Sequence, residues 1–263
     1  MEIVVAIKVV PDSQSIIVDP IKKTLNRSQA KSVINPPDRN GIELAISLKE
    51  KYGGTVTVIT MGPPWAEDQL KEAISMGADN GILITDRYFA GADTYPTSLT
   101  VAKTVSKIKF DLVICGEETT DSSTAQVGPG VAEHLKIPQA TFIHSLEYQP
   151  NEKKILAERL VEGGIEYLSI PLPAVVTASL NMNIVRAPTL KGRIRGKKAV
   201  IVKWGLKDIE LPKEWVGLSG SPTKVREVKT EESEYREVTI LSGSISEIVD
   251  NLYAVIEKVD LND

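Results

Sequence analysis

Short runs of apolar and β-branched residues alternate with segments of helical periodicity over the first half of the chain. Four such runs are each followed by a turn rich in Gly, Pro or Asp and then by a helical pattern; they cover residues 3–10, 55–61, 81–85 and 112–115. Strands that alternate with helices in this way are typical of βαβ units, whose strands pair in parallel. The pattern predicts an α/β fold with a parallel sheet in a domain over residues 1–180.

Proline, glycine and capping residues mark the helix boundaries. Because proline is excluded from a helix interior, the first helix is expected after Pro36 and Pro37, with Asp38 as its cap and Gly53 beyond its end. Three further helices are predicted, over residues 66–76, over residues 94–109 and, after a long polar loop, up to about residue 136.

The pattern changes at about residue 140 to strands joined by hairpin-like turns, and the sheet is expected to end near residue 179. From residue 181 onward, basic residues, prolines and scattered glycines indicate an extended arm over residues 181–263 that ends in a helix over residues 244–259. Ser244 and Glu247 fit a capping box at the start of that helix. Its apolar stripe consists of Ile245, Ile248, Leu252, Val255 and Ile256. Such a stripe is buried against the rest of the domain or against a partner chain.

Composition excludes several classes of protein. Hydrophobic residues make up 42% of the chain and charged residues 25%, which is typical of globular domains. A single cysteine, Cys115, excludes disulfides within the chain and thiolate-held clusters. His134 and His144 are the sole histidines, so no metal site and no catalytic triad can be assembled from them. We therefore expect no metal and no catalytic residue in this chain.

The N-terminal residues form a strand-like run and lack the basic and apolar regions of a signal peptide. No run approaches the ~20 apolar residues that a membrane-spanning helix needs. The sequence thus predicts a cytoplasmic protein that is not an integral membrane protein.

The polar loop over residues 116–130 is the most unusual segment. It places hydroxyls, a carboxylate, an amide and small residues between the carboxyl end of a parallel strand and the start of a helix. Ligands bind at that edge of a parallel sheet, and amides at a helix N-terminus favour phosphate. Two more loops of similar character, residues 35–38 and 61–63, belong to the same edge. A Ser/Thr-rich capping loop that binds nothing is the alternative.

We therefore predict a Rossmann-like nucleotide-binding domain, although neither the P-loop nor the G-x-G-x-x-G motif is present. Its predicted binding residues are Ala6, Asn35, Pro36, Pro37, Asp38, Met61, Asp121, Ser122, Ser123, Thr124, Ala125, Gln126, Val127, Gly128, Pro129, Gly130 and Val131.

Several segments of the chain, in order, resemble the electron-transfer flavoprotein beta subunit. These are Ala-Ile-Lys at residues 6–8, Ser-Val-Ile-Asn-Pro-Pro-Asp at 32–38, Met-Gly-Pro at 61–63, Met-Gly-Ala-Asp at 76–79, the loop at 116–130 and Val-Arg-Ala-Pro-Thr-Leu-Lys at 185–191. The resemblance implies a heterodimer with an alpha subunit that carries an FAD. In conventional members the beta pocket holds AMP, and the subunit serves electron transfer from dehydrogenases to a quinone oxidoreductase.

Two stretches resemble the flavin-bifurcating, Fix-like branch of that family. They are Asp-Arg-Tyr-Phe-Ala-Gly-Ala-Asp-Thr at residues 86–94 and an early hairpin at residues 18–20 and 24–27. In that branch FAD replaces AMP in the beta pocket, and NADH is the electron donor. One electron then passes toward a quinone-oxidoreductase-like flavoprotein and one toward a ferredoxin-like protein, with peripheral attachment to the membrane through such partners. The small residues at 122–125 leave room for the diphosphate of FAD, so FAD and AMP both remain open.

The basic stretch over residues 181–207 contains eight Lys and Arg residues and no acidic residue. Within it, Arg186, Leu190 and Lys191 match the family's recognition loop, which implies a docking surface for a redox partner or the alpha subunit. A solvated face is the plain alternative, and a nucleic-acid surface is disfavoured because aromatic residues are scarce there and the net charge is −4. A universal-stress-type nucleotide-binding protein, a rival of another class, leaves the arm unexplained.

Overall fold

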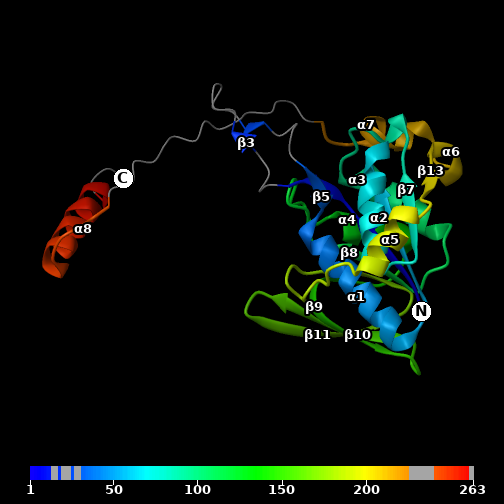
Figure 1. Cartoon of the computed structure of the whole chain (residues 1–263), viewed down its shortest axis with the longest axis horizontal. Coiled ribbons are helices and arrows are strands. Elements are labelled where there is room, and N and C mark those ends of the chain that lie inside the picture. The colour runs from blue at the N-terminus through cyan, green and yellow to red at the C-terminus, as the bar shows by residue number, and fades with distance from the viewer. Residues whose placement is uncertain (13–16, 19–24, 27–30, 225–239, 261–263) are drawn as a thin grey trace. The chain divides into compact units, whose positions relative to one another are not determined.

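The computed structural model describes residues 1–12, 17–18, 25–26, 31–224 and 240–260. The chain forms two compact units, Met1–Lys224 and Val225–Asp263 (Figure 1). Within the described ranges, no helix combines the length and apolar character that crossing a membrane requires.

A nine-stranded sheet forms the centre of the first unit, in the order β11-β10-β9-β12-β8-β1-β6-β7-β13. Its strands are β1 (Glu2–Ile7), β6 (Thr55–Met61), β7 (Asn80–Ile84), β8 (Leu112–Gly116), β9 (Gln139–Gln149), β10 (Lys154–Val161), β11 (Gly164–Pro171), β12 (Ala174–Ala178) and β13 (Val202–Trp204). In this order the pairs from β9–β12 to β7–β13 are parallel, and the pairs β11–β10 and β10–β9 are antiparallel. The α/β class with a mainly parallel sheet is confirmed.

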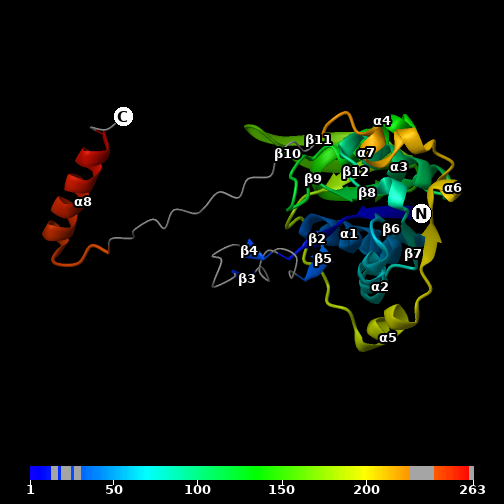
Figure 2. The same ribbon diagram turned by 90° about the horizontal axis from the view of Figure 1, so that it is seen from above.

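Helices cover both faces of this sheet (Figure 2). One face carries α1 (Pro36–Tyr52), α2 (Glu67–Met76) and α5 (Leu190–Lys198), and the other carries α3 (Thr94–Ser106), α4 (Val127–Leu135), α6 (Leu206–Ile209) and α7 (Gly217–Gly220). Each face has its own cluster of buried apolar side chains, which explains why the central strands are apolar on both sides. Short 3-10 helices η3 (Pro64–Ala66), η4 (Arg87–Phe89) and η5 (Lys213–Trp215) join some of these elements.

Two predicted boundaries are wrong. The helix α1 begins at Pro36, with Asn35 as its N-cap, because the first positions of a helix have no intrahelical use for an N–H and proline fits there. Asp38 therefore lies inside the first turn and does not cap the helix. The sheet also continues beyond Ala178, because β13 pairs in parallel with β7 at the far edge.

The early part of the chain contains two short antiparallel pairs outside the main sheet. The run predicted over residues 3–10 divides into β1 and β2 (Val9–Pro11), and β2 pairs with β5 (Ser32–Ile34). The expected hairpin is represented by β3 (Ile17–Val18) paired with β4 (Leu25–Asn26), while residues 19–24 and 27 lie outside the described residues.

The C-terminal helix of the second unit, α8 (Ile245–Asp260), confirms the predicted capping box. The Glu247 carboxylate accepts from Ser244 N at 2.7 Å, and Glu247 N donates to Ser244 Oγ at 3.4 Å. The apolar stripe of α8 is largely exposed, and Ile245 has 84% of its surface accessible to solvent.

Candidate functional site

A cavity of about 530 Å³ opens where the carboxyl ends of β1, β6 and β8 meet the first turns of α3 and α4. Its walls come from segments that are far apart in the chain. They include Ala6, Lys8, Asp38, Met61, Ala92, Asp93, Thr94, Thr97, Cys115, Gly116, Glu117, Glu118, Thr119, Ser122, Thr124, Ala125, Gln126, Val127, Gly128 and Thr223. Its volume falls within the range of roughly 300–1,000 Å³ typical of small-molecule sites.

The structure brings about half of the predicted binding residues to this cavity. Those that line it are Ala6, Asp38, Met61, Ser122, Thr124, Ala125, Gln126, Val127 and Gly128. The remaining predicted residues are not among its lining residues; they are Asn35, Pro36, Pro37, Asp121, Ser123, Pro129, Gly130 and Val131. Two of these contact residues that line the cavity: Asn35 donates to Asp38, and Asp121 accepts from Lys8.

Asp38 ties together the ends of two neighbouring strands. Its carboxylate accepts from Lys8 N at 2.6 Å and from Gly116 N at 3.1 Å. Asn35 Nδ2 donates to the same carboxylate at 3.0 Å and to the carbonyl of Glu118 at 2.8 Å. Burial raises the pKa of Asp38 to about 7, against the lowering effect of these hydrogen bonds. Asp38 and Asn35 thus fix the backbone from which the polar loop starts.

Lys8 supplies a positive charge next to the loop. Its Nζ donates to Asp121 Oδ1 at 2.7 Å and to Ser122 Oγ at 2.8 Å. Burial opposes ionisation of Asp121, but the hydrogen bonds from Lys8, Thr119 and Ser122 outweigh it and hold the pKa of Asp121 below its usual value. Lys8 was not among the predicted site residues, although it belongs to the motif at residues 6–8.

The first turn of α4 lines the cavity through Val127 and Gly128, and no side chain caps the start of this helix. Ser123 and Ala125, just before it, have φ values of 47° and 54°, a left-handed conformation that is unusual for residues other than glycine. Such backbone near a helix N-terminus presents N–H groups to a ligand.

Gly128 and Gly130 contribute to packing within the chain. A Cβ on Gly128 would lie 2.3 Å from Thr177 Cγ2, and one on Gly130 would lie 2.7 Å from Ser98 Oγ. The absence of a side chain at these two positions therefore allows α4 to pack closely against Thr177 of β12 and Ser98 of α3.

The stretch at residues 86–94 anchors the chain that follows the sheet. The Asp86 carboxylate accepts from Leu206 N at 3.1 Å. Asp93 caps α3 through Tyr95 N and also accepts from Thr223 N at 3.0 Å and Thr223 Oγ1 at 2.8 Å. Because Asp93 and Thr223 both line the cavity, their hydrogen bonds bring Thr223, which follows α7, to one of its walls.

Across this wall, Thr94 Oγ1 donates to Gln126 Oε1 at 2.9 Å and so links α3 to the polar loop. The wall residues Asp93, Thr94 and Thr223 were missed among the predicted site residues. For the first two, the motif at residues 86–94 was the available signal; for Thr223 the sequence offers none.

Cys115 and the histidines offer no reactive group at the cavity. Cys115 is buried in β8, and burial raises the pKa of its thiol to about 12, so the thiolate is not populated near neutral pH. His134 packs edge-on against Tyr95, and His144 lies 3.4 Å from Glu158 in the antiparallel part of the sheet.

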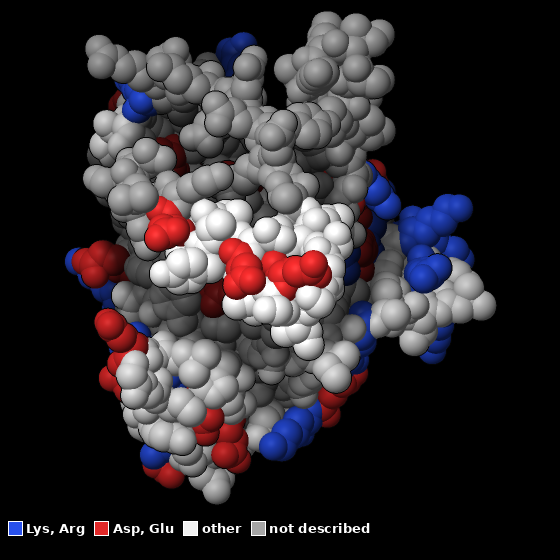
Figure 3. All heavy atoms as spheres, turned by 90° about the vertical axis from the view of Figure 1, so that its left-hand side faces the viewer, with Lys and Arg blue, Asp and Glu red and all other residues white. Residues whose placement is uncertain are grey.

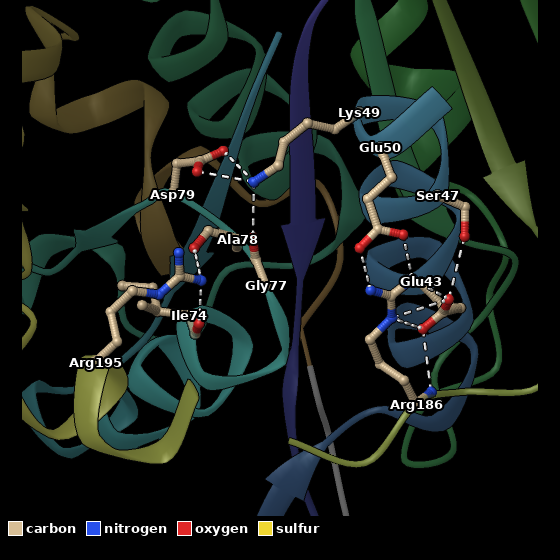
Figure 4. A network of polar contacts seen from close by, with 10 residues as sticks. All are labelled: Glu43, Ser47, Lys49, Glu50, Ile74, Gly77, Ala78, Asp79, Arg186 and Arg195. Carbon is tan, nitrogen blue, oxygen red and sulfur yellow. Dashed lines mark hydrogen bonds and ion pairs between the residues drawn. The ribbon is translucent and has the colours of Figure 1, made fainter. Parts of the chain in front are cut away.

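Of the three predicted partner-recognition residues, Arg186 makes extensive contacts within the chain (Figure 4). Its Nε donates to Glu43 at 2.9 Å and its Nη1 to Glu50 at 2.6 Å, both on α1. Leu190 opens α5 with 78% of its surface exposed, and Lys191 is exposed beside it. Lys and Arg side chains gather at the right of Figure 3, where α5 stands.

The fold and the cavity define an α/β protein with a ligand-sized site at the carboxyl edge of a parallel sheet. Residues 22–209 match the model of the electron transfer flavoprotein domain family. The chain is 45% identical to an electron transfer flavoprotein subunit beta of Thermoanaerobacterium thermosaccharolyticum, over 96% of each chain. The chain belongs to the electron transfer flavoprotein family, in its beta-subunit group.

Two further relatives extend this similarity. The chain is 39% identical to Protein FixA of Azorhizobium caulinodans, over 98% of this chain and 94% of the relative. It is also 39% identical to the caffeyl-CoA reductase-Etf complex subunit CarD of Acetobacterium woodii, over 86% of each.

Proposed function

We propose that the chain is the beta subunit of a heterodimeric electron-transfer flavoprotein and binds FAD through the carboxyl-edge cavity. NADH is the proposed electron donor, a second FAD belongs to the alpha subunit, and the acceptors are a ferredoxin-like protein and a quinone-oxidoreductase-like flavoprotein. The observation that carries the proposal is the cavity itself, where the uncapped start of α4, Lys8 and several hydroxyls converge.

These residues fit the adenosine diphosphate part of FAD. A diphosphate needs N–H or cationic donors, and the first turn of α4 and the Lys8 ammonium supply both kinds. The carboxylates of Asp38, Asp93 and Glu117 also line the cavity. Each accepts hydrogen bonds from backbone amides of its own chain, and these bonds offset part of its repulsion of an anion. The side chains of Ser122, Thr124 and Ala125 are small, so the diphosphate has room beside them.

When bound, FAD would supply the hydride and single-electron chemistry. The role proposed for this chain is to hold the nucleotide and to fix its orientation. Asp38 keeps the ends of β1 and β8 in place, and Asp93 keeps Thr223 against the cavity. No side chain of this chain is required to transfer a proton.

AMP binding is the second candidate, since the same donors serve a single phosphate. In that case the chain is a conventional beta subunit that takes part in electron transfer between dehydrogenases and a quinone oxidoreductase. The two candidates differ in the number of flavins per heterodimer.

The test is to purify the chain together with its alpha subunit, extract the bound nucleotides with acid and quantify them by chromatography. Two FAD and no AMP per heterodimer is the expected result; one FAD and one AMP indicates the conventional function. A Lys8→Gln variant is expected to retain less of the beta-subunit nucleotide, whereas Lys103→Gln, on the exposed side of α3, serves as the matched control.

A separate proposal concerns Leu190, which we assign to docking of an electron-transfer partner, with the exposed stripe of α8 assigned to the alpha subunit. Both surfaces are apolar and exposed in the described residues. Leu190→Ala is expected to slow electron transfer to an acceptor protein with unchanged flavin content, and Val200→Ala is the control. Equal rates in the parent protein and both variants would remove this role.

We also propose that the assembly is located in the cytoplasm and that any membrane attachment is made by its partners.

A further inference from the structure

A second cavity, of about 740 Å³, lies at the other end of the sheet from the proposed nucleotide site. It is bordered by the amino ends of β6 and β7, by the residues that follow α3 and by the end of α5. Its lining residues are Thr57, Ile74, Asp79, Asn80, Gly81, Ile82, Lys107, Ile108, Lys109, Arg195, Lys198, Ala199, Val200, Val202 and Trp204. None of them belongs to the predicted nucleotide-binding set.

Positive charge collects around this cavity from two separate segments. Lys107 and Lys109 follow α3, and Arg195 and Lys198 belong to α5. Lys107 is paired with Glu210 at 2.8 Å. Within the ranges that the structure describes, no acidic side chain pairs with Lys109, Arg195 or Lys198. The lining carboxylate, Asp79, is already bound to Lys49 at 2.8 Å.

The ends of helices account for part of this charge. α2, α3 and α5 all end near the cavity, and each helix C-terminus carries roughly half a negative charge. Three such ends amount to roughly −1.5, against three cations without an acidic partner. By this count the helix ends balance about half of the charge of these three cations, which leaves an excess of positive charge at the cavity.

Arg195 is held in place before any ligand binds. Its Nη2 donates to the carbonyls of Ile74 at 2.7 Å and Ala78 at 2.9 Å (Figure 4). A guanidinium has five N–H groups, so others remain for a second partner. The helix that carries it is also closely seated, since a Cβ on Gly196 would lie 2.4 Å from the carbonyl of Lys71. A cation fixed in this way loses little entropy when it binds an anion.

The interior of the cavity is apolar. Ile74 and Ile82 are buried at its wall, Trp204 is half-buried, and Val200 and Val202 are exposed at its rim. An inorganic ion would leave this surface in contact with water. We propose that the cavity is a binding site for an amphipathic organic anion, with a phosphate or carboxylate group on Arg195, Lys109 and Lys198 and an apolar or aromatic body against Trp204.

The test is a calorimetric titration of the purified full-length heterodimer with phenyl phosphate, benzoate and inorganic phosphate. Phenyl phosphate is expected to bind more tightly than inorganic phosphate, and benzoate distinguishes a carboxylate group from a phosphate group. The double variant Lys109→Gln with Lys198→Gln is expected to weaken binding by at least about tenfold, because two charge-assisted contacts are lost. The matched control, Lys103→Gln with Lys197→Gln, removes the same charge from α3 and α5 outside the cavity and is expected to change binding less than about twofold.

Three outcomes overturn the proposal. These are no binding of phenyl phosphate or benzoate by the parent protein, equal weakening in both double variants, and displacement of the probe by saturating AMP, which would place it in the other cavity. All four lysines are exposed, so circular dichroism and thermal melting of both variants are expected to match the parent.

Discussion

At the carboxyl end of the sheet, carboxylates bind backbone amides, whereas at the amino end cations also bind backbone carbonyls. Asp38 and Asp93 accept from N–H groups of distant segments, and Arg195 and Lys49 donate to carbonyls near the end of α2. Acidic residues at the carboxyl end of the sheet therefore hold loops in position, although the ligand proposed for that end is an anion. Basic residues at the amino end of the sheet offset the negative charge of the helix C-termini there and leave positive charge in excess.

A substitution at Gly116, which contacts Asp38, is expected to disrupt the carboxyl end of the sheet most strongly. A Cβ on Gly116 would lie 2.1 Å from Asp38 Oδ1, so Gly116→Ala is expected to reduce the free energy of unfolding by about 3 kcal/mol. Urea denaturation measures the change. The control Gly164→Ala has open space at its Cβ and is expected to stay within about 0.5 kcal/mol. A neutral Gly116→Ala variant would mean that the Asp38 bridge is dispensable.

The Asp38→Asn variant tests the role of Asp38 through the pH dependence of the free energy of unfolding. Folding raises the Asp38 pKa from 3.8 to about 7, so its favourable contribution is complete below pH 3.8 and is lost as the pH rises through 7. The asparagine side chain of the variant does not titrate and is similar in shape to the protonated carboxyl, so the stability of the variant relative to the parent is expected to rise by about 2 kcal/mol between pH 5 and pH 8. Denaturation curves of both proteins from pH 5 to 8 provide the measurement. A relative stability of the variant that stays constant or falls as the pH rises would contradict this assignment.

Arg186→Met tests the contact between the arm and α1. Glu43 is buried and would lose its partner, so the free energy of unfolding is expected to fall by about 1–2 kcal/mol. Arg193→Met removes an exposed arginine of α5 and is the control. If the two variants behave alike in thermal melting, the contacts of Arg186 contribute nothing specific.

Thr223→Val is expected to have the smallest effect, about 1 kcal/mol, since it removes one hydroxyl bond to Asp93 and leaves the Thr223 N–H bond intact. Because Thr223 lines the cavity, bound nucleotide per heterodimer is expected to fall as well. Ser106→Ala, which removes an exposed hydroxyl of α3, is the control for both measurements. A loss of stability with full nucleotide content would limit Thr223 to a structural role.

Local patterns predicted the elements of this fold well where their signals are strong. The buried strands and the capping box of α8 follow directly from apolar runs and from the Ser244 and Glu247 pair. The strand β13 was missed because three residues inside a basic segment carry too little periodicity, and its pairing with β7 depends on a partner more than a hundred residues earlier.

The candidate site was predicted by position along strands, which explains both its successes and its gaps. Ala6 and Met61 lie at the cavity because parallel strands end at one edge, and Gln126 lies there because the loop after β8 leads to the start of α4. Thr223 lies there because of tertiary contacts with Asp93 that no spacing along the chain indicates. The recognition residues and the domain boundary at residue 180 stay predictions, and the compact unit observed here continues to Lys224.

The position of β13 has a consequence for how the chain folds. Until residues 202–204 have been synthesised, β7 presents an unpaired parallel edge, and such edges promote association between chains. Edge pairing over so long a stretch of sequence is also slow, because the loop must close before the contact stabilises it. During translation the sheet therefore remains open on this side until the basic segment has emerged from the ribosome, and that segment completes the edge with only three residues, one of them Lys203.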